Sequence, residues 1–187
     1  MAMQTRSFPM QDFQTRDEDG NLYIEGYFSV FNSRYTIGQI GYETVAAGAF
    51  SESLANDDIR ALVNHDSTLV LGRIAAGTLE LREDEIGLWG RITINPNDRD
   101  AVNLYERVKR GDVSQCSFGF DIIEQTTEEL PDNTIHWTLV RVKLYEVSVV
   151  TFPAYPDTAV EARSSEAETI RAARWKSAML ARLKGDA

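Results

Sequence analysis

The sequence is poor in thiols and imidazoles, which limits the disulfide and metal chemistry that it can support. Among its 187 residues there is one cysteine, Cys116, and there are two histidines, His65 and His136. A single thiol excludes an internal disulfide and a zinc site made of several cysteines. Two imidazoles leave little material for a histidine-rich metal centre. The composition therefore argues against chemistry centred on a metal.

Basic residues are outnumbered, and long apolar runs are missing. The chain carries 19 lysines and arginines against 29 acidic residues, which gives a formal net charge of -10 at pH 7. Such a surface repels phosphate backbones, so we do not expect a nucleic-acid partner. The longest apolar runs, such as residues 147–150 with Ser148 among them, fall far short of a membrane span. No apolar stretch follows the first six residues as it would in a secretory signal, so we expect a soluble intracellular protein without a membrane partner.

The chain does contain enough apolar material for a core. Hydrophobic residues make up 43% of it and aromatic residues 10%, over a length typical of one good-sized domain. We interpret residues 1–20 as a flexible N-terminal arm, because they are polar and lack periodicity. Residues 21–160 are expected to form the folded domain, and residues 161–187 a helical, basic C-terminal tail.

Short segments of alternating or β-branched residues predict many strands. They span residues 22–31, 59–63, 69–75, 78–82, 88–94, 116–122, 135–142 and 143–151. A short helix is expected at residues 48–56 and a longer one at residues 98–110, where Asn97 or Asp98 can cap the start and Gly111 can end it. Many short strands with one longer internal helix predict an α+β fold whose sheet is small and closed or strongly curved.

The amino-acid composition of the chain changes after Ala159. Residues 166–184 are rich in alanine and favour a helix. Residues 170–184 include no acidic residue and five basic ones, Arg171, Arg174, Lys176, Arg182 and Lys184. Two interpretations remain open, a solvated helix packed on the domain and a detachable basic segment that docks on an acidic surface.

His65 is the side chain best suited to acid–base chemistry. It stands where a strand ends and a turn begins, so that a rigid scaffold would hold an accessible imidazole. A neutral imidazole accepts a proton near neutral pH. The alternative is a surface histidine in a turn, paired with Asp66. We interpret His136 as a solvent-facing strand residue.

Ser117 is the candidate nucleophile. It lies on the strand face opposite Cys116, which is expected to point into the core, and two residues before Gly119. A glycine there would let a substrate backbone come close. A serine hydroxyl needs a neighbouring base, so Ser117 is a nucleophile only beside His65 and otherwise an ordinary strand serine. Ser114 is the competing serine.

Glu146 is the candidate third member, which would orient the imidazole and stabilise its charged form. It shares one strand face with Leu144 and Ser148, and a carboxylate on such a face is costly to bury without a partner. The alternatives are that Glu146 is an ordinary acid on a wet face, or that Asp66 is the third member. From the residues alone, the argument reaches a serine hydrolase and no further.

Four stretches of the chain resemble the prohead, or head maturation, protease family of tailed bacteriophages. They are residues 26–32 (GYFSVFN), residues 43–50 (ETVAAGAF), residues 64–66 and 71–73 (NHD and LGR), and the pair 116–120 and 146–150 (CSFGF and EVSVV) followed by residues 152–156 (FPAYP). Their order and spacing between about residues 22 and 157 carry the resemblance. The family is similar to the herpesvirus assemblins, which implies a compact β-barrel flanked by helices.

The resemblance implies a serine endopeptidase. Its nucleophile would be Ser117, its general base His65 and its third member Glu146, at a position where assemblins have a second histidine. Backbone N–H groups near Ser117 and Gly119, aided by an arginine such as Arg73, would stabilise the oxyanion. No metal or cofactor would be needed.

The same resemblance implies the substrates and the location. The enzyme would be packaged inside the immature capsid, in the host cytoplasm, where it would cleave scaffold or the scaffolding extension of the major capsid protein, and then itself. The basic tail would dock the precursor in the assembling shell and be removed on maturation, and the similarity to assemblins suggests a homodimer.

Two alternatives to a serine protease remain. The first is a non-enzymatic capsid-assembly or scaffolding protein on the same fold. The second is a metal-dependent hydrolase that would use Asp57, Asp58, His65 and Asp66, although an acidic turn explains this cluster without a metal.

Overall fold

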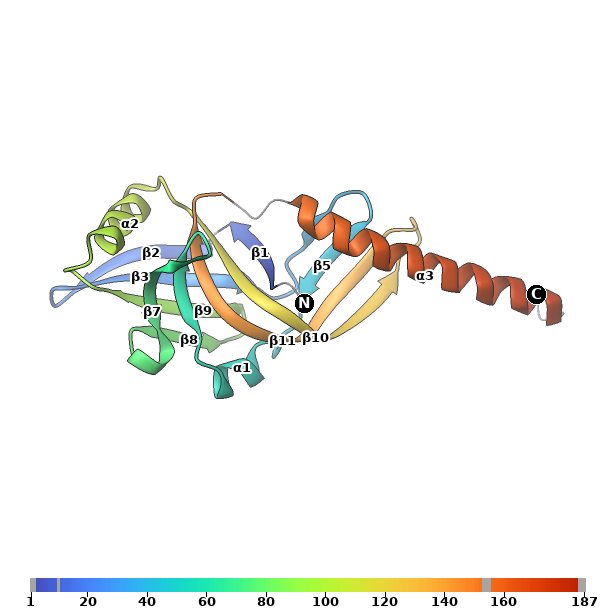
Figure 1. Cartoon of the computed structure of the whole chain (residues 1–187), viewed down its shortest axis with the longest axis horizontal. Coiled ribbons are helices and arrows are strands. Elements are labelled where there is room, and N and C mark those ends of the chain that lie inside the picture. The colour runs from blue at the N-terminus through green and yellow to red at the C-terminus, as the bar shows by residue number, and fades with distance from the viewer. Residues whose placement is uncertain (1–2, 10, 153–155, 185–187) are drawn as a thin grey trace.

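A computed structural model describes residues 3–9, 11–152 and 156–184 of the chain (Figure 1). Its strands are β1 (Gln4–Pro9), β2 (Gln11–Glu18), β3 (Asn21–Val30), β4 (Tyr35–Ile37), β5 (Gly41–Val45), β6 (Arg60–Val63), β7 (Asp66–Arg73), β8 (Leu79–Glu83), β9 (Gly87–Ile94), β10 (Gln115–Glu129) and β11 (Ile135–Val150). Its helices are α1 (Ser51–Asn56), α2 (Arg99–Arg110) and α3 (Pro156–Lys184), with one 3-10 turn, η1 (Ile74–Ala76). This mixture of strands and helices confirms the predicted α+β class.

The strands form two sheets. The larger has the order β1-β10-β11-β5-β4, and it also contains β6, paired with β11, and β7, paired with β6. The smaller has the order β2-β3-β9-β8. Among the described residues neither sheet closes on itself through hydrogen bonds, so the expectation of a closed barrel was wrong. Strand β11 continues through residue 143, where two separate strands were predicted. It pairs in parallel with β5 near its start and with β6 near its end, so the larger sheet branches at β11 and does not return to its first strand.

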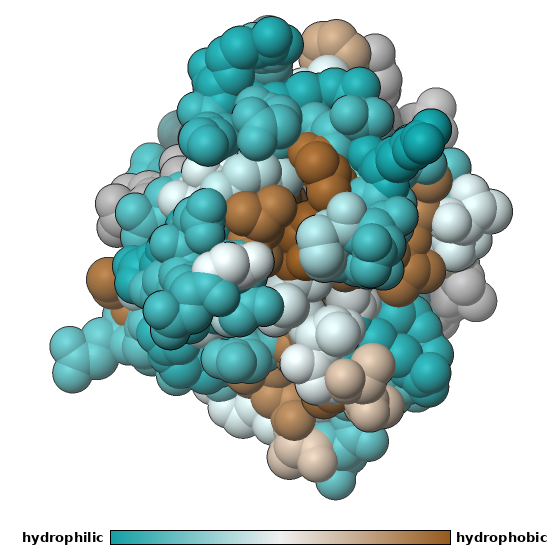
Figure 2. Space-filling model, turned by 90° about the vertical axis from the view of Figure 1, so that its left-hand side faces the viewer, coloured by the Kyte–Doolittle hydropathy of each residue, from teal (hydrophilic) through white to brown (hydrophobic). Residues whose placement is uncertain are grey.

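The two sheets enclose the main core. Fully buried apolar side chains come from β3 and β9 in the smaller sheet and from β10 and β11 in the larger, among them Ile24, Phe28, Leu88, Ile92, Cys116, Phe118, Phe120, Val147 and Val149. Burying a large apolar side chain contributes about 1.5–3 kcal/mol, so this alternation along each strand holds the sheets together. Figure 2 shows the end of the molecule near α2, where mostly hydrophilic residues surround apolar side chains at the centre of the face.

Helix α2 begins and ends where the sequence predicts. The Asp98 carboxylate accepts hydrogen bonds from the backbone N–H groups of Asp100 (3.0 Å) and Ala101 (3.3 Å), which satisfies donors that the first turn leaves free. Gly111 ends the helix with a left-handed backbone (φ +87°) that favours glycine. Buried residues of α2, including Leu104 and Tyr105, close one side of the main core.

The first residues of the chain form strands, which differs from the flexible arm expected from the sequence. Strand β1 pairs antiparallel with β10, from Gln4 opposite Phe120 to Pro9 opposite Gln115. Strand β2 pairs antiparallel with β3. Each is the terminal strand of its sheet, where backbone pairing on one side holds a segment of polar composition. Hydrophobic periodicity gives little signal for such a strand.

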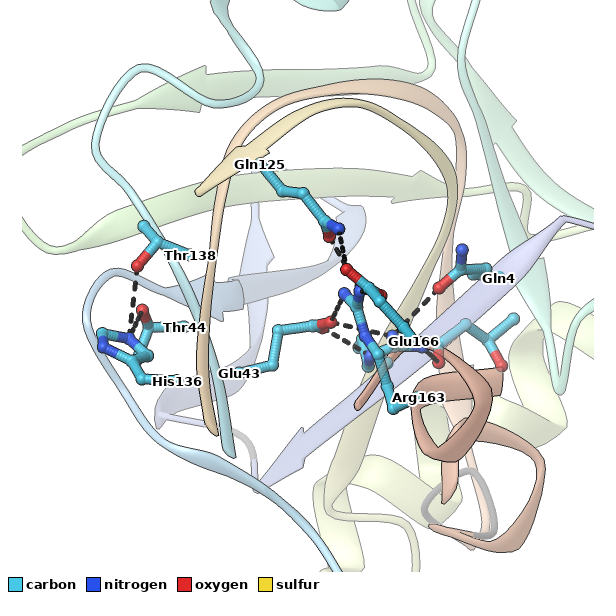
Figure 3. A network of polar contacts seen from close by, with 10 residues as sticks. Gln4, Glu43, Thr44, Gln125, His136, Thr138, Arg163 and Glu166 are labelled. Atoms are coloured by element: carbon cyan, nitrogen blue, oxygen red, sulfur yellow. Dashed lines mark hydrogen bonds and ion pairs between the residues drawn. The ribbon is translucent and has the colours of Figure 1, made fainter. Parts of the chain in front are cut away.

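A buried network of charged side chains joins both ends of the chain to the larger sheet (Figure 3). Glu43 on β5 is 1% exposed and accepts a hydrogen bond from Nε of Arg6 on β1 at 2.6 Å. Its other carboxylate oxygen pairs with Arg163 of α3, which also donates to Gln125 Oε1 (2.8 Å) and Glu166 Oε2 (2.7 Å). One buried carboxylate therefore pairs with two buried guanidinium groups from opposite ends of the sequence, and Glu166 gives Arg163 a second carboxylate.

We expect Glu43→Ala to destabilise the protein strongly, because it leaves Arg6 buried without a carboxylate and Arg163 with Glu166 alone. Breaking a buried ion pair in this way costs about 3–5 kcal/mol of unfolding free energy. Equilibrium unfolding in urea measures the change. The control is Glu52→Ala, which removes an exposed pair with Arg141 and is expected to cost less than about 1 kcal/mol. A loss of unfolding free energy in Glu43→Ala as small as that in the control would show that the network does not stabilise the fold.

Helix α3 packs on the body near its start and extends away from it further on (Figure 1). Ala167 is buried with Trp137 and Ile135, and Ile170 packs against the same cluster. Arg174 pairs with Glu129, after which residues 175–180 are all exposed. The interpretation as a helix packed on the domain therefore holds for its first part. No helix in the described part of the chain combines the length and the apolar character that crossing a lipid bilayer requires.

Candidate active site

A strained turn presents His65. Strand β6 ends at Val63, and Asn64 and His65 follow with left-handed backbones (φ +51° and +62°), a region where Asn and His are enriched among residues other than glycine. The Asn64 backbone N–H donates to the Val149 carbonyl at 3.0 Å, and its side-chain oxygen accepts from the Thr151 backbone N–H at 2.8 Å. These contacts fix the turn beside the end of β11.

The His65 imidazole meets Glu146, which lies 81 residues further along the chain. His65 Nδ1 is 2.6 Å from Glu146 Oε1, and the other carboxylate oxygen accepts the Ser148 hydroxyl at 2.5 Å. The Glu146 side chain is 4% exposed and the His65 side chain 22%. Glu146 is thus not the ordinary surface acid of the alternative interpretation. Burial of a carboxylate is favourable only with such partners.

The other ring nitrogen of His65 is left without a hydrogen bond. Nε2 is buried and has no hydrogen-bond partner among the described residues. When Glu146 accepts the Nδ1 proton, Nε2 carries the lone pair of the neutral imidazole. The pair therefore presents a buried proton acceptor whose orientation a carboxylate fixes.

Ser117 lies on the same sheet face as this pair. In the ladder of β10 and β11, Ser117 is opposite Ser148 and Gly119 is opposite Glu146. Opposed residues of an antiparallel pair share a face, so the serine, the glycine and the carboxylate gather beside His65. Ser117 is fully buried, and its hydroxyl donates to the Arg6 carbonyl of β1 at 2.9 Å. No hydrogen bond joins Ser117 to the imidazole in the part of the chain that the structure describes.

Gly119 makes room for the carboxylate. A Cβ atom placed on it would lie 2.3 Å from Glu146 Oε1 and 2.9 Å from the sulfur of Met3. The sequence interpretation, that the glycine lets a substrate backbone approach, differs from this finding, because the space over Gly119 is filled by Glu146. A glycine opposite an acid in a ladder is the signal that sequence reasoning missed.

The other residues considered for the site either lie outside it or form hydrogen bonds with other groups. Ser114 is exposed before the start of β10. Asp66 accepts from the Thr68 backbone N–H and hydroxyl, and these bonds hold the pKa of its carboxyl below the ordinary value. Arg73, considered as an oxyanion donor, pairs with Asp58, and the hydrogen bond lowers the pKa of that carboxyl.

His136 and Cys116 also differ from catalytic groups. His136 Nε2 lies 2.8 Å from the Thr44 hydroxyl and its ring stacks on Tyr42, so it is half-buried where a solvent-facing residue was predicted. Cys116 is fully buried, as predicted, and burial raises the pKa of its thiol far above the ordinary value. A thiol that does not ionise is a poor nucleophile.

The residues of the metal hypothesis do not come together. In the described ranges no group of three or more His, Cys, Asp or Glu side chains is placed to hold a metal ion. The acidic turn around Asp58 is explained by its pairing with Arg73 and Arg60.

A serine, an imidazole and a buried carboxylate on one sheet face are the components of a serine hydrolase. Comparison with known proteins defines the family. Residues 11–172 match the family described as Caudovirus prohead serine protease. The chain is 30% identical over 174 residues to the prohead protease of Enterobacteria phage HK97, covering 90% of this chain and 73% of that protein. The chain belongs to the Caudovirus prohead serine protease family and is a serine protease of capsid maturation.

A solved structure supports the same fold. The bacteriophage T4 capsid assembly protease, gp21, matches with a TM-score of 0.53 at 11% identity, over 81% of this chain and 98% of that chain. At this identity the likeness concerns the fold alone. The family match and the HK97 relative confirm the family predicted from the four motifs, and they do not support the non-enzymatic alternative.

Proposed function

We propose that Ser117 is the nucleophile of this protease, His65 its general base and Glu146 the group that orients the base. The observation that supports the proposal best is the buried pair of His65 Nδ1 and Glu146 Oε1, at 2.6 Å, with Nε2 left free to accept a proton. Ser117 adds a hydroxyl on the same face, opposite Ser148 in the ladder. A serine hydroxyl needs a neighbouring base to act as a nucleophile, and His65 supplies that base in this proposal.

The reaction would be acyl transfer in two steps. In the first, Ser117 Oγ attacks the carbonyl carbon of the scissile peptide bond while His65 Nε2 takes the hydroxyl proton. The C–N bond of the tetrahedral intermediate then breaks, the amine leaves with the proton from His65, and an acyl-enzyme ester remains. In the second step a water, deprotonated by His65, attacks the ester and releases a carboxylic acid and the free serine. Glu146 supports the imidazolium in both steps.

The described conformation is a resting state in this proposal. Ser117 is fully buried, and its hydroxyl is directed to the Arg6 carbonyl. For catalysis the hydroxyl has to turn from Arg6 to His65 Nε2, and the chain that covers Ser117 has to open to the substrate. The buried Arg6–Glu43 pair anchors β1 and holds this closed arrangement.

The proposed substrates are scaffold or the scaffolding extension of the major capsid protein, and the protease itself, inside the immature capsid in the host cytoplasm. The family and its part in capsid maturation support this choice. The exposed residues 175–180 of α3 are accessible to a second protease molecule, which is consistent with removal of the basic tail. Association as a homodimer stays a prediction.

Co-expression with the major capsid protein of the same phage tests the proposal. Intact-mass analysis of the particles is expected to show a shortened capsid protein or loss of scaffold, and a protease that lacks C-terminal residues. A fluorophosphonate, which modifies activated serines, is expected to label Ser117 and to block both cleavages. Uncleaved capsid and scaffold proteins in mature particles would contradict the proposed substrates. A protease with an intact C-terminus would contradict removal of the tail. Labelling of another serine would assign the role of nucleophile to that residue.

A further inference from the structure

We infer that Ser148 is a positioning residue, which locks both the Glu146 carboxylate and the His65 turn in place for the reaction. The inference rests on the proposed function of His65 and Glu146. Ser148 is fully buried on β11, two residues after Glu146 and on the same strand face. Nothing in the acyl-transfer steps uses its hydroxyl directly.

The two hydrogen bonds of Ser148 run in fixed directions. Its oxygen accepts the backbone N–H of His65 at 3.2 Å, and its hydroxyl donates to Glu146 Oε2 at 2.5 Å. A backbone N–H can only donate and a carboxylate can only accept, so no other assignment satisfies both contacts. The hydroxyl proton therefore always points to the carboxylate.

These contacts complete a ring. It runs from the His65 backbone to Ser148, from Ser148 to Glu146, and from Glu146 back to the His65 imidazole. One hydroxyl thus fixes the backbone of the base and the orientation of the acid that directs it. With Oε2 held by Ser148, Oε1 is left to face Nδ1. A bond from a neutral donor to a carboxylate is among the stronger hydrogen bonds, which suits this role.

The backbone under Ser148 is held on both sides. Its partner on β10 is Ser117, and its partner on β6 is Leu62, three residues before His65. Backbone pairing on both sides restricts the movement of the chain at Ser148. Ser148 is therefore a rigid reference point between the strand that carries the nucleophile and the strand that leads to the base.

Without the hydroxyl the carboxylate loses its second partner. Glu146 is 3% exposed, so water is not available to replace the lost bond without a change of structure. The carboxylate is then free to rotate away from Nδ1, and the His65 backbone N–H is left unpaired. A misplacement of about 1 Å in a catalytic group costs about 10²-fold in rate.

Kinetics of serine labelling in the full-length protein test the inference. Ser148→Ala is expected to slow fluorophosphonate labelling of Ser117 by about 10- to 100-fold without weakening initial binding of the probe. Ser148→Thr keeps the hydroxyl and is expected to recover most of the rate. The matched control is Ser29→Ala, which removes a buried hydroxyl of β3 that has no hydrogen-bond partner among the described residues. A wild-type labelling rate in Ser148→Ala, or label on Ser148 itself, would overturn the inference.

Proton NMR provides a readout that does not depend on activity. The short hydrogen bond between His65 Nδ1 and Glu146 is expected to give a proton resonance far downfield, measurable in the Ser117→Ala background, where self-cleavage is absent. Adding Ser148→Ala should shift or broaden this resonance, and adding Ser29→Ala should not. An unchanged resonance in the first case contradicts the positioning role. If the wild-type protein instead fails to label at Ser117, the proposed nucleophile is wrong, while the resonance still reports whether Ser148 holds the pair.

Discussion

Replacing Ser117 with alanine is expected to lower the rates of self-cleavage and capsid-protein cleavage by on the order of 10³-fold or more. The variant keeps the imidazole and the carboxylate but has no group that forms the acyl-enzyme. Its fold is expected to survive, because the change removes one hydrogen bond, to the Arg6 carbonyl, worth about 1 kcal/mol. Gel electrophoresis and intact mass over a time course measure the rates, and circular dichroism checks the fold.

The control for this prediction is Ser114→Ala. Ser114 is exposed and lies three residues before Ser117, so a variant there should cleave at the wild-type rate. Cleavage retained in Ser117→Ala and lost in Ser114→Ala would assign the nucleophile to Ser114. Loss of cleavage in both variants would point to a change in the whole segment rather than in one hydroxyl.

Glu146→Gln is expected to reduce the rate by on the order of 10³- to 10⁴-fold although the side chain keeps its shape. The Ser148 hydroxyl donates at the position of Oε2, so the amide oxygen of glutamine is held there and its NH₂ group faces His65. An NH₂ group donates to Nδ1, which moves the imidazole proton to Nε2. The ring then cannot accept the proton of Ser117.

The rate of fluorophosphonate labelling measures this loss, and Glu124→Gln is its control. Glu124 lies on β10, is 56% exposed, and pairs only loosely with Arg141 at 3.6 Å. The control should label as the wild type does. If Glu146→Gln labelled equally fast, the carboxylate would not determine the state of the imidazole, and a dyad of serine and histidine would suffice.

The sequence was informative where local pattern and fold agree. Alternation of apolar residues predicted β3, and capping by Asp98 with a stop at Gly111 predicted α2, because these signals depend on neighbours in the chain. It failed for β1 and β2, whose partners are distant backbones. It also divided β11 in two, because a strand that leaves one partner and meets another changes its pattern of burial along its length.

The residues of the proposed site could be named from the sequence, but the contacts between them could not. Serine, histidine and glutamate were proposed from their chemical type and from the resemblance to the family. That His65 contacts Glu146 across 81 residues depends on the parallel register of β6 and β11, which no local pattern encodes. Gly119 acquires its role from the antiparallel register of β10 and β11, which places it opposite Glu146. Ser148 meets the His65 backbone because of the parallel register of β6 and β11.

The pairing of β1 with β10 has a practical consequence for handling this protein. Both long edges of β10 at residues 115–120 are taken, one by β1 and the other by β11. An extended peptide that adds itself to this strand as a further β-strand must first peel off the chain's own N-terminal segment. Affinity tags or truncations at the N-terminus therefore act close to Ser117, which pairs with Ser7 of β1, and protein with an unaltered N-terminal segment is the material for enzymology.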